Sequence, residues 1–178
     1  MTRILGAVLA GGRATRFGSD KALAMLDGRT LLDHALATLV PHVERLLVCG
    51  RPWRDVDWVA DRPASELGPL GGLNAALHSA AARGFDAVLS TACDVPSLPQ
   101  PLVRQLVSRG SAAFVAQLPV VGFWPVELAP RLDAHLAGGG DRSLRGWGRA
   151  ANAQRIAAER ALTNVNTEAD LSALIANS

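Results

Sequence analysis

The stretch ILGAVLAGGRATRFGSDK, residues 4–21, decides how the chain begins to fold. Residues 4–10 form a near-continuous apolar run, which is typical of a parallel-sheet strand covered on both faces. A pair of glycines ends this strand, and a charged loop follows. Backbone N–H groups beside glycines can approach phosphate oxygens closely, and Arg16 and Lys21 bring cationic side chains to the same loop. The stretch therefore predicts a buried first strand followed by a phosphate-binding loop.

The glycine spacing separates this loop from two common nucleotide-binding motifs. It is neither the dinucleotide-binding fingerprint nor the Walker A loop, because no Gly-Lys-Ser/Thr follows Gly18. A tight turn whose charges only keep it solvated is the simpler alternative. Lys21 favours phosphate binding, because the apolar residues 22–26 can anchor its stem while its ammonium group reaches back to the loop. Asp20 could equally pair with Arg16 and shape the loop.

The rest of the chain alternates strand-like and helix-like segments. Further strands are expected at residues 45–50, 57–60, 87–93, 112–115, 120–124 and 162–166, and helices at 31–39, 70–82, 102–107, 128–136, 144–150 and 168–175. Thr30, Ser143 and Thr167 are expected to cap three of these helices. The alternation predicts one α/β domain over residues 1–178, with a Rossmann-like three-layer αβα arrangement. Its twisted sheet is expected to be mostly parallel, with an antiparallel strand in the second half.

Composition argues against several classes of partner. A hydrophobic content of 49% is ample for one buried core in 178 residues. A net charge of +2 without a basic run, and 4% aromatic residues without tyrosine, argue against nucleic acid as a partner. No apolar stretch approaches the roughly 18 residues of a membrane span. Cys49 and Cys93 each follow an apolar run and suggest neither a disulfide framework nor a zinc cluster, so we expect a soluble cytoplasmic protein.

Asp94 is the candidate metal ligand. It follows the strand expected at 87–93, and in open parallel sheets ligands bind at the carboxyl ends of the strands. Mg²⁺ prefers a carboxylate together with phosphate oxygens and water, which is what a triphosphate site would offer. The alternative is a turn aspartate before Pro96. On this residue alone the two interpretations are equal, and the preceding glycine loop favours the ligand role.

The glycine loop resembles the signature Leu-Ala-Gly-Gly-x-x-x-Arg-Phe/Met-Gly-x-Asp-Lys of the guanylyltransferases that make molybdopterin guanine dinucleotide. These enzymes are a branch of the nucleotide-sugar pyrophosphorylase-like fold. The matching residues here are Leu9, Ala10, Gly11, Gly12, Arg16, Phe17, Gly18, Asp20 and Lys21. Three later segments are similar to family motifs: Asp61 followed by Gly-Pro-Leu-Gly-Gly-Leu at 68–73, Thr-Ala-Cys-Asp-Val-Pro at 91–96, and Asn-Val-Asn-Thr at 164–167. Four motifs in the right order are far more specific than any one of them.

The resemblance implies a reaction and a set of site residues. GTP and molybdopterin, which would carry molybdenum, would give molybdopterin guanine dinucleotide and pyrophosphate, with Mg²⁺ as the cofactor. Arg16, Lys21 and Asp94 would be catalytic, and Asp94 would hold the metal. The nucleotide and its metal would be bound by Leu9, Ala10, Gly11, Gly12, Arg13, Lys21, Asp61, Gly68, Pro69, Leu70, Gly71, Asp94, Asn164 and Asn166. Asn166 would either complete the metal shell or bind the pterin.

The resemblance also implies that the domain has two functional halves. Residues 1–100 would bind the nucleotide and residues 101–178 the acceptor pterin. We expect a monomer that makes transient contact with molybdoenzyme maturation proteins. Two departures concern the substrate contacts. Residues 116–123 are shorter than the expected hairpin and lack its polar segment, and Arg51 stands where the family tends to place an Asn near the base.

The rival functions are a molybdopterin cytidylyltransferase, another nucleotidyltransferase such as a nucleotide-sugar or alditol-phosphate transferase, and a non-catalytic carrier. Molybdopterin cytidylyltransferases share the reaction but use CTP, and they tend to carry Leu-Ala-Ala-Gly, so Gly11 and the turn at 68–72 favour guanine. A non-catalytic nucleotide or cofactor carrier would keep the glycines but could lose Lys21 and Asp94. Both residues are present, which favours an enzyme.

Overall fold

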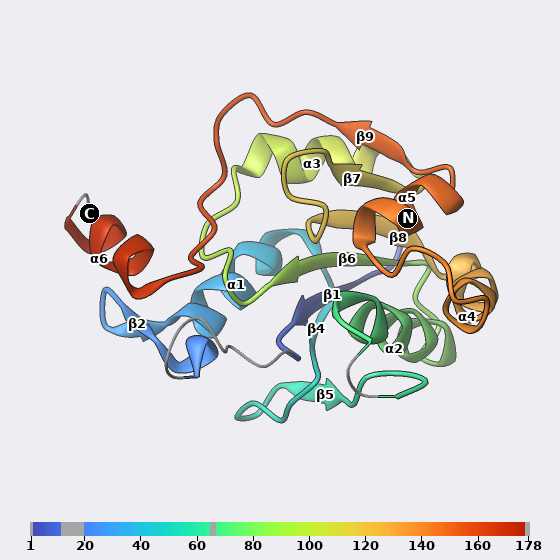
Figure 1. Cartoon of the computed structure of the whole chain (residues 1–178), viewed down its shortest axis with the longest axis horizontal. Helices are drawn as coiled ribbons and strands as arrows, with labels where there is room; N and C mark the ends of the chain where they lie inside the picture. The colour runs from blue at the N-terminus through green and yellow to red at the C-terminus, as the bar shows by residue number, and fades with distance from the viewer. Residues whose placement is uncertain (1, 12–19, 65–66, 177–178) are drawn as a thin grey trace.

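A seven-stranded sheet forms the centre of the molecule, with helices on both of its faces (Figure 1). The structure is a computed structural model and describes residues 2–11, 20–64 and 67–176. The strands of the large sheet are β1 Ile4–Leu9, β4 Arg45–Cys49, β5 Asp57–Val59, β6 Ala87–Ala92, β7 Ala113–Val115, β8 Gly122–Pro125 and β9 Gln154–Ile156. A small hairpin pairs β2 Met25–Leu26 with β3 Arg29–Thr30.

Six α-helices and three short 3-10 helices lie in the described residues. The α-helices are α1 Leu31–Leu39, α2 Pro69–Ala82, α3 Gln100–Ser108, α4 Ala129–Ala137, α5 Leu144–Ala150 and α6 Glu168–Ala176. The 3-10 helices are η1 Lys21–Leu23, η2 Val40–His42 and η3 Val126–Leu128. None of the helices in the described residues is long and apolar enough to cross a membrane.

The strand order is β5-β4-β1-β6-β8-β7-β9. β1, β4, β5 and β6 pair in parallel, and β9 runs parallel to β7. β8 pairs antiparallel with both of its neighbours, so the expected antiparallel strand in the second half is confirmed. The expected fold class, a single α/β domain with a mostly parallel sheet and helices on both sides, is also confirmed.

Side chains of the central strands alternate between two hydrophobic cores, because successive residues of a strand point to opposite faces. In β1, Ile4 and Val8 lie in the core that α1 and α3 cover. Leu5 and Ala7 lie in the core that α2, α4 and α5 cover. The near-continuous apolar sequence of β1 is the consequence of this burial on both faces.

Three predicted helix caps are confirmed. The Thr30 hydroxyl accepts a hydrogen bond from the Asp33 N–H at 3.1 Å, at the start of α1. The Ser143 hydroxyl accepts from the Gly146 N–H at 2.9 Å, at the start of α5. The Thr167 hydroxyl accepts from the Asp170 N–H at 3.1 Å, at the start of α6. These side chains satisfy N–H groups that have no partner within the helix.

The strand predicted at residues 162–166 is wrong. This segment has no regular secondary structure, and one backbone hydrogen bond joins it to the sheet edge, from the Val165 N–H to the Asp94 carbonyl at 2.8 Å. The strand that completes the sheet is β9, which ends at residue 156. Of its three residues only Ile156 is buried, so its sequence carries too weak an apolar pattern to reveal a strand.

Candidate active site

The carboxyl ends of β1, β4, β5 and β6 meet along one edge of the sheet, because these strands run parallel. Backbone hydrogen bonds extend the pairing beyond the strand ends. The Ala10 N–H donates to the Cys49 carbonyl at 2.9 Å, and the Gly50 N–H donates to the Val59 carbonyl at 2.8 Å. The loops that leave these strands are therefore held close together at this edge.

A cavity of about 570 Å³ opens at this edge. Its lining residues are Leu9, Ala10, Gly11, Asp20, Lys21, Ala22, Gly68, Pro69, Ala92, Cys93, Asp94, Leu118, Pro119, Val120, Ser143, Leu144, Arg145 and Asn164. Eight of these, Leu9, Ala10, Gly11, Lys21, Gly68, Pro69, Asp94 and Asn164, are candidate site residues from the sequence. The cavity thus brings residues from all four sequence motifs to one place.

Glycine is required where the loops after β1 and β4 touch. Gly50 has a φ of +95°, and a Cβ there would lie 2.6 Å from the Gly11 backbone N. A Cβ on Gly11 would lie 3.2 Å from the Gly50 Cα and 3.1 Å from both carboxylate oxygens of Asp61. The absence of side chains lets the backbone of the first loop pack directly on the loop after β4 and on this carboxylate.

Asp61 packs between Gly11 and the start of α2 and does not line the cavity. Cβ atoms added to Gly71 and Gly72 at the start of α2 would also approach it, at 3.2 Å from its Cβ and 3.5 Å from its Oδ1. Its Oδ1 is buried and has no hydrogen-bond partner among the described residues. Burial raises the pKa of Asp61, because the charged form loses its hydration. The Oδ1 of Asn164, which lines the cavity, is likewise buried without a partner among the described residues, so the site holds two buried acceptors that ligand donors could satisfy.

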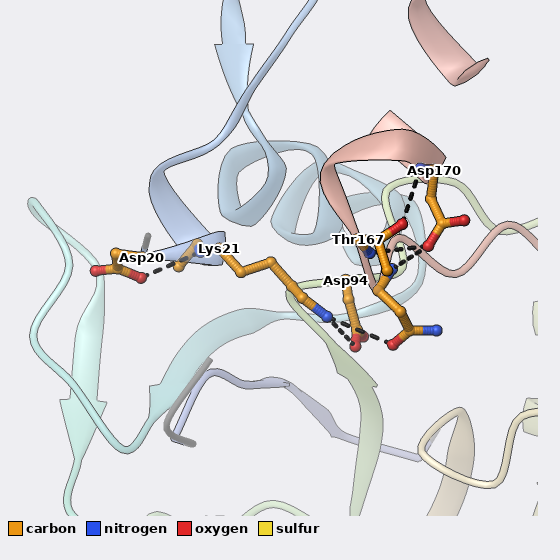
Figure 2. Close-up of polar contacts among 7 residues, drawn as sticks. Asp20, Lys21, Asp94, Thr167 and Asp170 are labelled. Carbon is orange, nitrogen blue, oxygen red and sulfur yellow. Dashed lines mark hydrogen bonds and ion pairs between the residues drawn. The ribbon is translucent and has the colours of Figure 1, made fainter. Parts of the chain in front are cut away.

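Lys21 lies between two oxygen-bearing side chains. Figure 2 shows its side chain reaching from η1 to Asp94 at the end of β6, and its Nζ lies 3.3 Å from the Asp94 Oδ2. The same Nζ lies 3.5 Å from the Oδ1 of Asn166. Both side chains of the ion pair are largely shielded, with 15% exposed for Lys21 and 23% for Asp94. One ammonium, one carboxylate and one amide oxygen therefore face a common point.

The C-terminal segment is fastened to this point from two sides. The Asp170 Oδ2 accepts hydrogen bonds from the N–H groups of Asn166 at 2.9 Å and Thr167 at 2.8 Å, and the Thr167 hydroxyl accepts from the Asp170 N–H (Figure 2). The Val165 side chain is fully buried against Leu26 and Leu31. Asn166 is thus held between a buried anchor and a helix cap.

The oxygen donors suit a hard cation that also binds phosphate. No group of three or more His, Cys, Asp or Glu residues that could hold a metal by itself occurs in the described part of the chain. Mg²⁺ needs no such cage, since it is usually bound through one or two carboxylates together with phosphate oxygens and water. Cys93 also lines the cavity, but burial raises the pKa of its thiol to about 12, so it stays protonated and is not a nucleophile at neutral pH.

Some sequence candidates fall outside the cavity. The Leu70 side chain is fully buried in the core on the α2 face, and Gly71 packs on Asp61. Asn166 reaches the site through Lys21 and is not part of the lining. Gly12, Arg13 and Arg16 lie outside the described residues.

Sequence reasoning missed two parts of the site. Residues 118–120, in the turn between β7 and β8, and residues 143–145, at the start of α5, form the far wall of the cavity. Residues 118–120 lie within the segment 116–123, which the family resemblance links to substrate contacts, whereas residues 143–145 carry no motif and were missed. The second missed part is an ion pair of Asp20 with Arg51, a residue that the resemblance places near the base. Any pairing of Asp20 with Arg16 lies outside the described residues.

Solved structures share this architecture. Molybdopterin-guanine dinucleotide biosynthesis protein A from Archaeoglobus fulgidus superposes with a TM-score of 0.77 at 20% identity, covering 97% of each chain. The 2-C-methyl-D-erythritol 4-phosphate cytidylyltransferase from Thermus thermophilus gives a TM-score of 0.71 at 15% identity, covering 99% of this chain and 98% of its own. At these identities the likeness concerns the fold alone, which is that of the nucleotidyltransferases.

Sequence relatives narrow the class to a family. Residues 6–156 match the MobA-like NTP transferase domain. The molybdenum cofactor guanylyltransferase of Rhodobacter capsulatus is 37% identical over 178 residues, covering 95% of this chain and 93% of the relative. That of Acidiphilium cryptum (strain JF-5) is 36% identical, covering 93% and 91%. The chain belongs to this family of molybdenum cofactor guanylyltransferases and is a nucleotidyltransferase.

Proposed function

We propose that this chain transfers the GMP moiety of GTP to molybdopterin that carries molybdenum, giving molybdopterin guanine dinucleotide and pyrophosphate. The observation that carries the proposal is the position of the Lys21 ammonium. It lies between Asp94 and Asn166 and lines a cavity that begins at the glycine turn. A triphosphate needs such a cation, and the guanine preference is supported by the named activity of the relatives.

The nucleotide-binding half, residues 1–100, supplies the phosphate and nucleoside contacts in this proposal. The backbone of residues 9–13 holds the triphosphate, and Arg16 and Lys21 neutralise its charge. Asp61 accepts a hydrogen bond from the base or ribose through its unpartnered Oδ1. Residues 68–71 and Asn164 complete the nucleoside subsite.

Magnesium is the metal that we assign to the site. The Asp94 carboxylate would hold it, and the Asn166 amide oxygen faces the same point, because both approach the Lys21 Nζ. Bound Mg²⁺ would neutralise the triphosphate and the departing pyrophosphate. Lys21 pairs with Asp94, and in this proposal its ammonium turns to a phosphate oxygen when the nucleotide binds.

The reaction is a single displacement at phosphorus. An oxygen of the terminal phosphate of molybdopterin attacks the α-phosphorus of GTP in line. The new P–O bond forms as the bond from the α-phosphorus to the bridging oxygen of the β-phosphate breaks, and that oxygen leaves with pyrophosphate. Because the attacking phosphate is already an anion, no general base is needed, and the protein contributes positioning and charge neutralisation.

The acceptor half, residues 101–178, faces the nucleotide loops across the cavity. Its lining residues are mostly apolar at 118–120, and Arg145 is the charged residue among them. We place the pterin against this wall. We also infer a cytoplasmic location, since Cys49 and Cys93 are free thiols, as is usual in reducing compartments.

Thermal unfolding with GTP, CTP, ATP or UTP, each with and without Mg²⁺, tests this function. A ligand that binds only the folded state stabilises it by about 2.7 kcal/mol at a hundredfold excess over its Kd. We expect a rise in Tm that is largest with GTP and Mg²⁺. A rise that is largest with CTP would overturn the choice of nucleotide.

Two variants test the assigned chemistry. Lys21→Ala and Asp94→Ala are expected to fold normally and to lose guanylyl transfer by about a hundredfold to a thousandfold, the usual cost of one electrostatic group. Glu44→Gln is a matched control, because Glu44 pairs with Arg3 ahead of β1, at the opposite edge of the sheet. Near-normal turnover by either alanine variant would remove that residue from the mechanism.

A further inference from the structure

Arg51 makes a close ion pair with the residue that precedes Lys21. It follows β4 and Gly50, and its Nη1 lies 2.6 Å from the Oδ2 and 2.7 Å from the Oδ1 of Asp20. One nitrogen of the guanidinium thus contacts both carboxylate oxygens. The pair joins the loop after β4 to the residue that precedes η1.

Asp20 in turn fixes the start of η1. Its Oδ1 accepts a hydrogen bond from the Ala22 N–H at 3.2 Å, which caps this 3-10 helix. Lys21 is the first residue of the helix. Figure 2 shows that the side chains of Asp20 and Lys21 extend in opposite directions from it. An ion pair that holds Asp20 therefore also fixes the start of η1, from which the Lys21 side chain extends.

The loop that carries Arg51 is itself held in place. The Trp53 side chain is buried, with 7% exposed, and its Nε1 donates to the Asp33 Oδ1 at 3.0 Å. The Arg51 guanidinium lies 5.8 Å from the centre of the Trp53 ring. Arg54 pairs with Asp33 at 3.1 Å. Arg51 thus reaches Asp20 from a loop fastened to α1.

We propose that Arg51 is a positioning residue for Lys21 and acts through Asp20. The proposal rests on the proposed role of Lys21 in phosphate binding. An ordinary surface ion pair is the alternative. The Arg51 and Asp20 side chains are 28% and 39% exposed, and such pairs contribute little to folding stability. Loss of the pair should therefore leave the Tm nearly unchanged and disturb the ammonium of Lys21, whereas loss of an ordinary surface pair would disturb neither.

The composition of the chain provides a direct readout. Lys21 is the only lysine, because the other basic residues of the Lys and Arg set are all arginine. Reductive methylation with ¹³C-formaldehyde therefore labels one side chain and the N-terminal amine, which peptide mass spectrometry separates. The labelling rate reports whether the Lys21 ammonium is held by its partners. The measurement needs no nucleotide and no turnover.

Labelling rates of four proteins test the proposal. We expect Arg51→Ala and Asp20→Asn to label Lys21 several-fold faster than the unaltered protein. Arg83→Ala is the matched control, because it removes a comparably exposed ion pair, with Asp57, that does not hold the Arg51 loop, and it should label at the unaltered rate. Equal rates for Arg51→Ala and the unaltered protein, or equal acceleration by Arg83→Ala, would overturn the proposal. If Arg51→Ala does not fold, Asp20→Asn decides alone.

Kinetics provide the second arm. We expect Arg51→Ala, Asp20→Asn and their double variant to lower kcat/KM for GTP by about the same factor, because a small displacement of a catalytic group can cost up to about a hundredfold. Arg51→Lys should recover most of the loss, because a single nitrogen makes both contacts. Additive losses in the double variant would contradict a shared action through Asp20.

The two proposals fail in different ways. If GTP with Mg²⁺ does not slow the labelling of Lys21 in the unaltered protein, the proposed function is wrong whatever the variants do. If GTP protects Lys21 in the unaltered protein but Arg51→Ala labels and turns over normally, only the positioning role is wrong.

Discussion

Lys21 occupies a position that an arginine would not fill. The chain uses arginine for all its other Lys and Arg positions, yet a lysine stands between Asp94 and Asn166. A lysine ammonium is a compact charge with three donors that can turn among partners, whereas a guanidinium is a planar fork. A group that exchanges Asp94 for phosphate oxygens needs the first kind of geometry.

Lys21→Arg is therefore expected to behave almost like a loss of charge. We predict that kcat/KM for GTP falls at least about tenfold, although the formal charge is kept, because the larger fork cannot share the same point with Asp94 and Asn166. Initial rates of pyrophosphate release measure this. Recovery of full activity by arginine would show that charge alone is required there.

The effect of Asp61 on folding stability can be separated from its proposed role in nucleotide binding. Burial raises the pKa of this carboxyl, so its folded state binds a proton more readily than its unfolded state. The stability contribution of such a group is complete below the ordinary value of 3.8 and is lost as the pH rises through the raised pKa. At neutral pH the buried charge therefore lowers the free energy of unfolding.

Asp61→Asn is expected to raise the Tm at pH 7 and to weaken stabilisation by GTP. The gain in Tm should shrink as the pH falls toward 3.8, where the native carboxyl also becomes neutral. Asp57→Asn is the control, because Asp57 is exposed and pairs with Arg83. Melting curves from about pH 4 to about pH 8, with and without GTP, measure both effects. A Tm gain that does not depend on pH would contradict the explanation.

At the residue scale the sequence predicted the side of the site that carries motifs. Gly11, Lys21, Asp94 and Asn164 all line the cavity. On the far wall, the resemblance links residues 116–123 to substrate contacts, but residues 143–145 could not be predicted, because they match no motif. They reach the cavity only through the path of the chain between β7 and α5, which no local pattern encodes.

Among the elements, α6 connects helix capping to the active site. Hydrogen bonds from the Asn166 N–H and then the Thr167 N–H lower the pKa of Asp170. The stability that this carboxylate contributes is therefore present above its ordinary pKa and is lost in acid, as the pH falls through the lowered value. At neutral pH the cap is fully charged and holds the backbone of Asn166.

Asp170→Ala is expected to lower guanylyl transfer about tenfold at pH 7, because it frees the backbone that presents the Asn166 amide beside Lys21. Thr167→Ala is the matched control. It removes the hydroxyl that accepts from the Asp170 N–H but leaves the Asp170 carboxylate on both N–H groups. Equal losses in the two variants would mean that only the helix cap matters, and that Asn166 does not.

Some helices and strands could be predicted from the sequence more accurately than others. Buried parallel strands such as β1 and β6 carry long apolar runs and were predicted within about a residue. The β2–β3 hairpin was missed although Asp27 and Gly28, with φ of 47° and 75°, form the Asp-Gly turn typical of hairpins. Its strands have two residues each, too few for an alternating pattern.

For the whole molecule, the return of the C-terminal segment completes the site. The last strand of the sheet is β9, which is the outer strand on the side opposite β5. The chain then passes back to the carboxyl edge, where Val165 inserts between the hairpin and α1 and Asn166 meets Lys21. The chain up to β9 therefore forms the sheet, and the segment after β9 completes the site.

Two truncations test this separation. Removal of residues 162–178 is expected to leave a folded sheet, destabilised by about 2 kcal/mol through loss of the buried Val165 side chain, and to reduce transfer by at least about a hundredfold. Removal of residues 168–178 alone keeps Val165 and Asn166, so a larger part of the activity should remain. Urea unfolding gives the stabilities, and rates of pyrophosphate release give the activities. Full activity of the longer truncation would show that the carboxyl edge is competent without Asn166, and the metal and phosphate roles would then rest on Lys21 and Asp94 alone.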